Sequence, residues 1–364
     1  METIKAIVID DTIVYRKIVG DVLKGIPGVE VIGVANNGKI ALSKIASLKP
    51  DLITLDIEMP EVNGIEVLQA LKDAPDAPVV IMLSTLTQQG SEMTIKALEL
   101  GAFDFVPKPD KGTMAENMLK VKDAVLPIID ALKRQKATKF KIREKIKAKP
   151  LAENIPAHKT PAIAIKRPSF KSKSEIIGIG ISTGGPNALT KMIPMLPADL
   201  NVPVLIVQHM PPMFTQSLAN SLNSKSTLEV KEAKNGDTIE PGKILIAPGG
   251  KQMKIIAGAD GITRKIKITD DPPENSCKPS VDYLFRSIAQ HYVGRSTGVI
   301  MTGMGSDGSK GLVQMKNNGS VVIAQNEETC TVYGMPKKPV ESGIADIVVP
   351  LENIAREIVK TTTP

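Results

Sequence analysis

Residues 176–189, IIGIGISTGGPNAL, contain the pattern that decides the fold. An apolar run rich in isoleucine is followed by a glycine-rich turn and then by a helical segment beginning near Pro186, a residue suited to a first helical turn. A strand, a short turn and a helix in that order make a βα unit, and chains of such units form parallel sheets with helices on both faces. The stretch therefore predicts an open α/β sheet.

The same alternation continues on both sides of this stretch. Further strand-like runs occupy residues 6–10, 29–35, 51–56, 78–84 and 103–107 before it, and 202–208, 243–248, 297–302, 319–325 and 345–350 after it. Helical segments separate several of these runs, including 38–48, 64–74 and 280–292. We predict two doubly wound parallel-sheet domains, the first flavodoxin-like and the second Rossmann-like.

A basic segment separates the two sets of runs. Between Lys133 and Lys173 there are 14 Lys and Arg but only two acids, so this segment carries +12 and the rest of the chain −5, against a total of +7. Four prolines interrupt it. We predict a linker over residues 136–172 that joins a domain at 1–135 to a domain at 173–364. A basic arm that touches nucleic acid or acidic lipid stays open as an alternative, although the segment holds too few aromatic residues for base stacking.

Length and composition narrow the class of protein. A chain of 364 residues can bury two full cores, and none of its apolar runs approaches the roughly 18 residues of a membrane span. The N-terminal METIKAIVIDD has no signal-like apolar region, and the two cysteines, Cys277 and Cys330, lack metal-ligand spacing. We expect a cytoplasmic protein without membrane insertion.

Polar side chains, three of them carboxylates, follow the strands of the first domain. They are Asp10, Asp11, Asp56, Ser84 and Lys108. Because the carboxyl ends of parallel strands share one edge, three carboxylates would meet there, and oxygen-only ligands of this type favour Mg²⁺. A cation and a lysine would screen a phosphoryl group while a carboxylate attacks it. The alternative is that these aspartates are ordinary turn residues.

This part of the chain resembles the response-regulator receiver family in the pieces VIDD, TLDIEMPEVNG, MLSTL and FDFVPKP. The resemblance implies that Asp56 accepts the phosphoryl group and that Asp10 and Asp11 help to position Mg²⁺. It further implies that Ser84 and Phe105 form the switch pair and that Lys108 senses the phosphate. Phe105 stands where many receivers carry Tyr, so no phenolic hydrogen bond can form there.

The second domain offers a candidate nucleophile. The turn of 176–189 fails as a dinucleotide fingerprint because Thr183 stands where a third glycine is required, but Gly180–Gly184 fits G-x-S-x-G around Ser182. A helix amino terminus behind Ser182 would help to hold negative charge. Glycine-rich turns also bind phosphate or simply turn, so a nucleophile and a structural turn both remain open.

A serine nucleophile needs a histidine base and a carboxylate, and the sequence offers few candidates for either. Of three histidines, His158 lies in the linker and His291 in a predicted helix, whereas His209 directly follows a strand. Asp307 lies in a glycine-rich turn after a further strand and could orient the imidazole. The weaker carboxylate candidates are Asp270, Asp271 and Asp282. The chain order Ser, His, Asp differs from that of α/β-hydrolases.

Residues 175–364 resemble the chemotaxis-type protein-glutamate methylesterases in six successive motifs: GIGISTGGP, VQHMPPMFT, APGG, KPSVDYLF, MTGMGSDG and AQNEETCTVYGMP. The resemblance implies a triad of Ser182, His209 and Asp307, with the backbone N–H of Met304 in the oxyanion hole. It implies hydrolysis of glutamate methyl esters on chemoreceptors with release of methanol, deamidation of receptor glutamines as a further candidate activity, and no cofactor for the hydrolysis.

The resemblance also implies a chemotaxis histidine kinase as phosphodonor and a receiver that covers the cleft until it is phosphorylated. One departure is visible, since many members carry His and Arg where this chain has Cys277 and Lys278. Two other functions stay open. One is a phosphorylation-dependent scaffold with an inert hydrolase domain. The other is a nucleic-acid-binding regulator, against which stands the absence of a helix-turn-helix pattern after the receiver.

Overall fold

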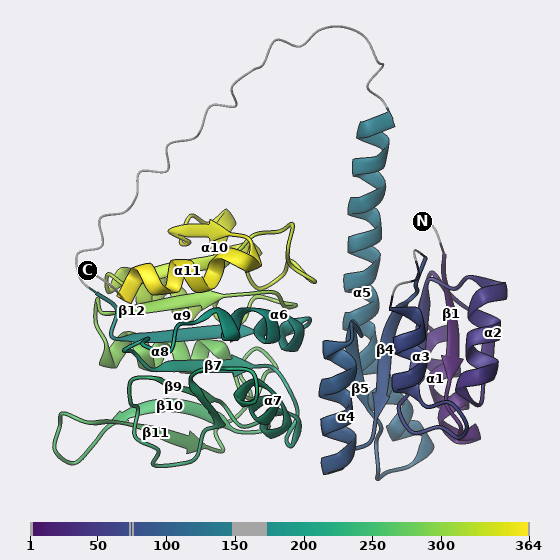
Figure 1. The fold of residues 1–364 in the computed structure, drawn as a ribbon, viewed down its shortest axis with the longest axis horizontal. Helices are drawn as coiled ribbons and strands as arrows, with labels where there is room; N and C mark the ends of the chain where they lie inside the picture. Colours follow the sequence, from purple (N-terminus) through teal and green to yellow (C-terminus); the bar gives the residue numbers. More distant parts are fainter. Residues whose placement is uncertain (1–2, 73, 75, 148–172, 363–364) are drawn as a thin grey trace, which may run out of the picture.

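The computed structural model describes residues 3–72, 74, 76–147 and 173–362, which form two α/β domains side by side (Figure 1). Each domain is built around a parallel sheet with helices on both faces, as the alternating pattern predicted. Helix α4 of the first domain lies next to the second domain.

The N-terminal domain, whose sequence resembles a receiver, has a five-stranded sheet in the order β2-β1-β3-β4-β5. Its strands are β1 (Ile4–Ile9), β2 (Val29–Ala35), β3 (Leu52–Asp56), β4 (Val79–Ser84) and β5 (Asp104–Pro107). Its helices are α1 (Ile13–Lys24), α2 (Gly38–Leu48), α3 (Gly64–Leu71), α4 (Gln88–Glu99) and α5 (Met114–Lys147). All strand pairs are parallel, and the strand order reverses between β1 and β3. Asp10 follows β1 and Asp56 ends β3, so both lie at this switch point.

The C-terminal domain, the candidate catalytic domain, has a seven-stranded sheet in the order β14-β13-β12-β6-β7-β9-β8, with parallel pairing throughout. Its strands are β6 (Ile176–Ile181), β7 (Val204–Gln208), β8 (Glu229–Glu232), β9 (Lys243–Ile246), β12 (Ser296–Ile300), β13 (Val321–Gln325) and β14 (Ile347–Val349). Its helices are α6 (Gly185–Met192), α7 (Phe214–Asn223), α8 (Val281–His291), α9 (Ser309–Asn317), α10 (Lys337–Glu341) and α11 (Leu351–Thr362), with a 3-10 turn η1 (Ile193–Met195). The central strand β6 pairs with β7 and β12.

An antiparallel hairpin, β10 (Gln252–Ala257) with β11 (Arg264–Thr269), lies outside the main sheet and was not among the predicted strands. Its apolar residues Met253, Ile255 and Ile266 are buried, while lysines alternate with them along both strands. The interleaved lysines shorten the apolar runs, so the sequence pattern of these two strands is weak. The hairpin packs against α8 and so supports the segment that follows it.

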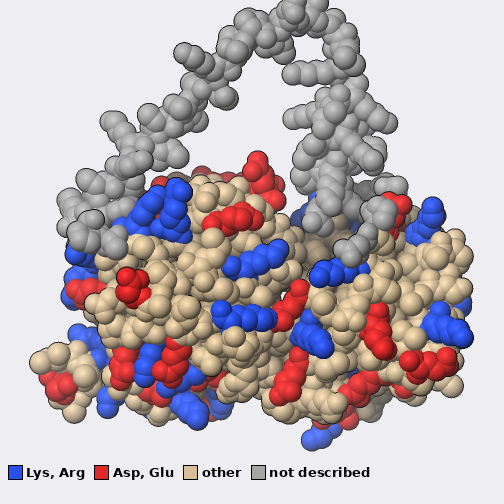
Figure 2. All heavy atoms as spheres, in the orientation of Figure 1, with Lys and Arg blue, Asp and Glu red and all other residues tan. Residues whose placement is uncertain are grey.

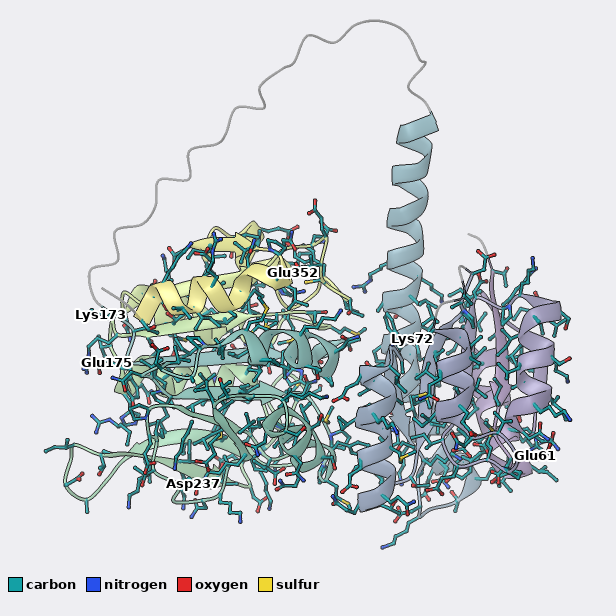
Figure 3. All side chains as sticks on the ribbon, viewed as in Figure 1. Glu61, Lys72, Lys173, Glu175, Asp237 and Glu352 are labelled. Atoms are coloured by element: carbon teal, nitrogen blue, oxygen red, sulfur yellow. The ribbon has the colours of Figure 1, made fainter. Side chains whose placement is uncertain are left out.

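The connection between the domains begins with the long helix α5, which ends at Lys147. Residues 148–172, most of the predicted linker, lie outside the described residues. Lys173 and Glu175 lie at the edge of the catalytic domain farthest from the receiver (Figure 3). On the face in Figure 2, basic and acidic side chains are interspersed over both domains. Among the described helices, none has the length and apolarity needed to cross a membrane.

Candidate active site and phosphorylation pocket

The receiver pocket brings together the carboxylates that the sequence placed at strand ends. Asp10, Asp11 and Asp56 present oxygens that lie within 4.8 Å of one another. The ammonium of Lys108 lies 2.8 Å from Asp10 Oδ2 and 2.7 Å from Asp56 Oδ2. Asp10 and Asp56 are buried, whereas Asp11 is exposed and opens the pocket to solvent. The pocket is therefore acidic and accessible from one side.

Burial dominates the electrostatics of this pocket. It raises the pKa of Asp56 to about 6, against the lowering effect of Lys108, and Asp10 adds to the rise. Burial lowers the pKa of Lys108, but the charges of Asp56 and Asp10 outweigh it and the net shift is upward. Three carboxylates against one ammonium leave an excess of two negative charges, which a divalent cation bound by oxygen ligands would balance. The donor set thus fits Mg²⁺.

The two predicted switch residues lie on neighbouring strands of the receiver: Ser84 ends β4, and Phe105 lies in β5 opposite Met82. Ser84 is buried, and its Oγ accepts a 2.6 Å hydrogen bond from Thr94 Oγ1 on α4. Phe105 points out of the receiver and stacks on Phe214 of the catalytic domain, with ring centroids 4.5 Å apart and 30° between the ring planes. A hydroxyl tied to α4 and an aromatic ring at the domain boundary connect the pocket to the neighbouring domain.

Ser182 directly follows the central strand β6, where the turn leads into α6. Its backbone N–H donates to Thr302 O at 3.0 Å, and its carbonyl accepts from Gly185 N at 2.7 Å and from Gln208 Nε2 at 3.0 Å. A Cβ on Gly303 would lie 2.6 Å from Ser182 Cβ, so the turn after β12 passes close behind the serine. Only glycine permits this approach.

His209 follows β7, and its Nε2 lies 2.8 Å from Asp307 Oδ2 in the turn after β12. Asp307 is buried and accepts further hydrogen bonds from Asn275, Ser280 and three backbone N–H groups, of which the shortest is Val281 N at 2.7 Å. Burial would raise the pKa of Asp307, but His209 and these donors lower it to about 2. The carboxylate is therefore ionised and fixed in place.

The pKa of the His209 imidazole shifts in the opposite direction to that of Asp307. Burial lowers the pKa of His209, but hydrogen bonds and charge from Asp307 and Cys277 raise it to about 9. Within the described residues no hydrogen bond joins Ser182 Oγ to His209, so the structure pairs His209 with Asp307 but leaves the serine hydroxyl outside the pair. Because Nε2 is engaged by Asp307, Nδ1 is the nitrogen left for a proton from Ser182.

Met304 lies in the turn between β12 and Asp307, next to Gly303, whose Cβ position abuts Ser182. The predicted oxyanion donor therefore follows directly in the chain the glycine that approaches Ser182, the predicted nucleophile. The rival carboxylates are engaged elsewhere: Asp270 with Lys251 and Lys278, and Asp271 with Tyr283. Asp282 accepts from Gly311 N at 2.7 Å, and Asn275 joins it to Asp307.

The receiver meets the catalytic domain next to this turn. Asp104, one residue before Phe105, lies close enough to Thr183, which follows Ser182, for the Thr183 side chain to lower the pKa of its carboxyl, although burial outweighs this and raises that pKa to about 6. Ser91 Oγ on α4 lies 2.7 Å from Ser217 Oγ on α7, and both are buried. Glu99 of α4 contacts Ser221 and Lys225 at the far end of α7. Residues next to Ser182 therefore lie at the domain boundary.

Two contacts of the His–Asp pair were not predicted. Cys277 Sγ lies 3.6 Å from His209 Nδ1, and Asn275 Nδ2 lies 2.9 Å from Asp307 Oδ1. Both belong to the segment DPPENSC, which has no apolar periodicity to place it on an element. The unusual cysteine before KPSVDYLF was the one signal in the sequence that this segment reaches the site.

Comparisons with known proteins find matches to both domains. The family model described as CheB methylesterase matches residues 177–358, and that of the response regulator receiver domain matches residues 6–119. A protein-glutamate methylesterase/protein-glutamine glutaminase of Desulfotalea psychrophila is 56% identical and 99% of each chain is covered. One of Bacillus subtilis is 43% identical, with 98% of this chain and 97% of the relative covered. A crystal structure of the Thermotoga maritima CheB methylesterase catalytic domain matches with 41% identity and a TM-score of 0.50, covering 51% of this chain and 98% of that one.

Proposed function

Because this chain belongs to the family of receiver-linked protein-glutamate methylesterases/protein-glutamine glutaminases that act in chemotaxis, we propose that Ser182, His209 and Asp307 carry out its hydrolytic reaction. The substrates are glutamate methyl esters, and glutamine side chains, on chemoreceptors. The 2.8 Å contact between His209 Nε2 and Asp307 Oδ2, at the same sheet edge as Ser182, carries the assignment.

The reaction is an acyl transfer in two halves. His209 Nδ1 takes the proton of the Ser182 hydroxyl while Oγ attacks the γ-carbonyl carbon, and backbone N–H groups including that of Met304 hold the oxyanion. The protonated imidazole then gives this proton to the leaving oxygen, and methanol departs from the acyl-enzyme. Water, deprotonated by His209, hydrolyses the acyl-enzyme and returns the serine. With a glutamine substrate, ammonia takes the place of methanol.

Asp307 stabilises the imidazolium that forms in each half of the reaction. Its six hydrogen-bond donors hold it ionised, so it does not compete for the transferred proton. Hydrolysis needs no cofactor in this scheme.

In the receiver, the Asp56 carboxylate accepts a phosphoryl group from a chemotaxis histidine kinase. Asp10, Asp11 and Asp56 would hold Mg²⁺, which supplies charge screening for the incoming phosphate when it is bound. Lys108 then exchanges its contact with Asp56 for the phosphoryl oxygens, and Ser84 turns toward them and away from Thr94.

This change reaches the catalytic domain through α4 and Phe105. Contacts of the receiver with Thr183, next to Ser182, and with the helix α7 support the proposal that the receiver restricts access to Ser182 until Asp56 is phosphorylated. Movement of α4 and Phe105 on phosphorylation would break these contacts and open the cleft. Restraint by the receiver explains why a hydrolase domain would be joined to it.

Methanol release from methylated receptor membranes tests the proposal. The full chain should release methanol faster with acetyl phosphate and Mg²⁺ than without them, and Ser182→Ala should lower the phosphorylated rate by roughly 10⁴-fold or more. Asn187→Ala, on the adjacent α6 helix, serves as the control. Activity of Ser182→Ala within tenfold of wild type would exclude this serine as the nucleophile. A methanol-release rate that is the same with and without acetyl phosphate would exclude control by the receiver.

A further inference from the structure

The catalytic imidazole has a partner at each nitrogen. Asp307 engages Nε2 at 2.8 Å, and Cys277 Sγ lies 3.6 Å from Nδ1, within hydrogen-bond range for sulfur. Cys277 Sγ also lies 3.4 Å from Asn275 O. With His209 protonated, Nδ1–H donates to the sulfur while the thiol donates to the Asn275 carbonyl. Asp307 and Cys277 are the titratable groups that contact His209 in the described part of the chain.

The turn that carries Cys277 is itself held firmly. Glu274 and Cys277 exchange two backbone hydrogen bonds, of 3.1 and 2.8 Å, and Gln252 Nε2 lies 3.4 Å from Cys277 O. The Glu274 carboxylate pairs with both terminal nitrogens of Arg286 on α8. Asn275, in the same turn, bonds to Asp307 Oδ1. One four-residue turn thus contacts both the histidine and the aspartate.

We propose that Cys277 is a positioning residue for His209, which holds the imidazole through Nδ1 and thereby controls when that nitrogen is available to Ser182. This inference rests on the proposed function, because it takes His209 to be the base. Nδ1 is the nitrogen that Ser182 must reach, and Cys277 occupies the space beside it. The thiol therefore aligns the ring and also competes with the serine hydroxyl for the same atom.

The raised pKa of His209 supports this role, since two residues raise it, Asp307 first and Cys277 second. Removing the sulfur should have two opposite effects. A lower proton affinity would leave more of the imidazole neutral near pH 7.5, whereas a poorly aligned ring would be a weaker base once it is fully neutral. These effects produce crossing pH profiles, which a general loss of structure would not.

The test measures His209 directly by ¹⁵N NMR of histidine-labelled full chain, since the chain has only three histidines and His209→Gln identifies the signal. Cys277→Ala should lower the His209 pKa by about 0.5 unit or more, and Cys277→Ser by less. Cys330→Ala is the matched control, because Cys330 is the other free cysteine and has no contact with His209 among the described residues. An unchanged His209 titration in Cys277→Ala would overturn the proposal.

Hydrolysis by the phosphorylated full chain gives the second readout. A 0.5-unit fall in pKa should raise kcat/KM of Cys277→Ala about threefold below pH 8, while its plateau near pH 10 falls below that of wild type. A uniform change at every pH would show a structural effect only and would overturn the proposal. The NMR titration repeated in Ser182→Ala reports on Cys277 even if the triad assignment fails, so the two failures are distinguishable.

Discussion

Phe105 of the receiver and Phe214 of the catalytic domain stack across the domain boundary, with ring centroids 4.5 Å apart. Phe214 begins α7 and is fully buried, so the stack joins a predicted switch residue to the core of the hydrolase domain. Aromatic pairs of this kind contribute about 0.5–1.5 kcal/mol beyond their buried area. A contact of this size would help to hold the receiver against α7.

Phe105→Ala should raise the methanol-release rate of the unphosphorylated chain severalfold, because the receiver would be held less firmly over the site. The phosphorylated rate should stay close to that of wild type, since the substitution leaves Ser182 and its partners intact. Phe103→Ala provides the control, because Phe103 packs against the receiver core rather than on Phe214. An unphosphorylated Phe105→Ala chain no more active than wild type would contradict restraint through this stack.

The pKa of Asp56 predicts how the receiver's stability depends on pH. Burial raises it from 3.8 to about 6, so the folded state favours the protonated acid. The contribution of protonated Asp56 to the free energy of unfolding is fully present below about pH 4. It is lost as the pH rises through about 6, which lowers the free energy of unfolding by up to about 3 kcal/mol. Asp56→Asn carries no such charge and should unfold at higher temperature than wild type at pH 7.5 in EDTA.

Thermal unfolding at two pH values checks this prediction. The advantage of Asp56→Asn should be largest at pH 7.5 and should shrink toward pH 4, where wild-type Asp56 is protonated as well. Asp123→Asn, an exposed aspartate on α5, should show no such trend. If Asp56→Asn were less stable than wild type at pH 7.5 without metal, the ionised, buried carboxylate of Asp56 would not destabilise the receiver, and the prediction would be wrong.

The strand pattern was sufficient to predict both parallel sheets and the residues at their carboxyl ends. Asp10, Asp56 and His209 lie where β1, β3 and β7 end, because a parallel sheet gathers such positions at one edge. Cys277 and Asn275 could not be placed this way. They reach the site through a turn whose position depends on packing of the β10–β11 hairpin and on the Arg286–Glu274 pair, both of them long-range contacts.

The contacts around Ser182 could not be predicted from the sequence either. G-x-S-x-G indicated a sharp turn, but the hydrogen bond from Gln208 to the serine carbonyl and the close approach of Gly303 come from two other strands. The contact of Thr183 with Asp104 depends on how the two domains dock, for which the sequence of either domain alone carries no signal.

Hydrolysis should become faster as pH rises toward 9. The pKa of His209 is raised to about 9, so at neutral pH most of the imidazole is protonated and cannot accept the serine proton. Asp307→Asn removes the first of the groups that raise this pKa, and it should shift the acid limb of kcat/KM to lower pH while lowering the plateau by roughly 10⁴-fold. A pH–rate profile with its acid limb unmoved in Asp307→Asn would contradict the pairing.

The approach of Gly303 to Ser182 predicts a substitution that harms catalysis more than folding. In Gly303→Ala the new Cβ would meet Ser182 Cβ at 2.6 Å and Met335 Sδ at 2.5 Å. The methionine side chain can move aside, but Ser182 is held by its backbone hydrogen bonds to Thr302 and Gly185, so Ser182, the proposed nucleophile, must itself shift. Displacing a reacting group by a fraction of an ångström lowers turnover by about 10–100-fold.

Methanol release with acetyl phosphate should show that loss in Gly303→Ala, while the midpoint of thermal unfolding moves by only a few degrees. Gly20→Ala, on a receiver helix where a Cβ meets nothing within 4 Å, should leave turnover unchanged. Wild-type turnover in Gly303→Ala would mean that the turn after β12 does not fix the position of Ser182.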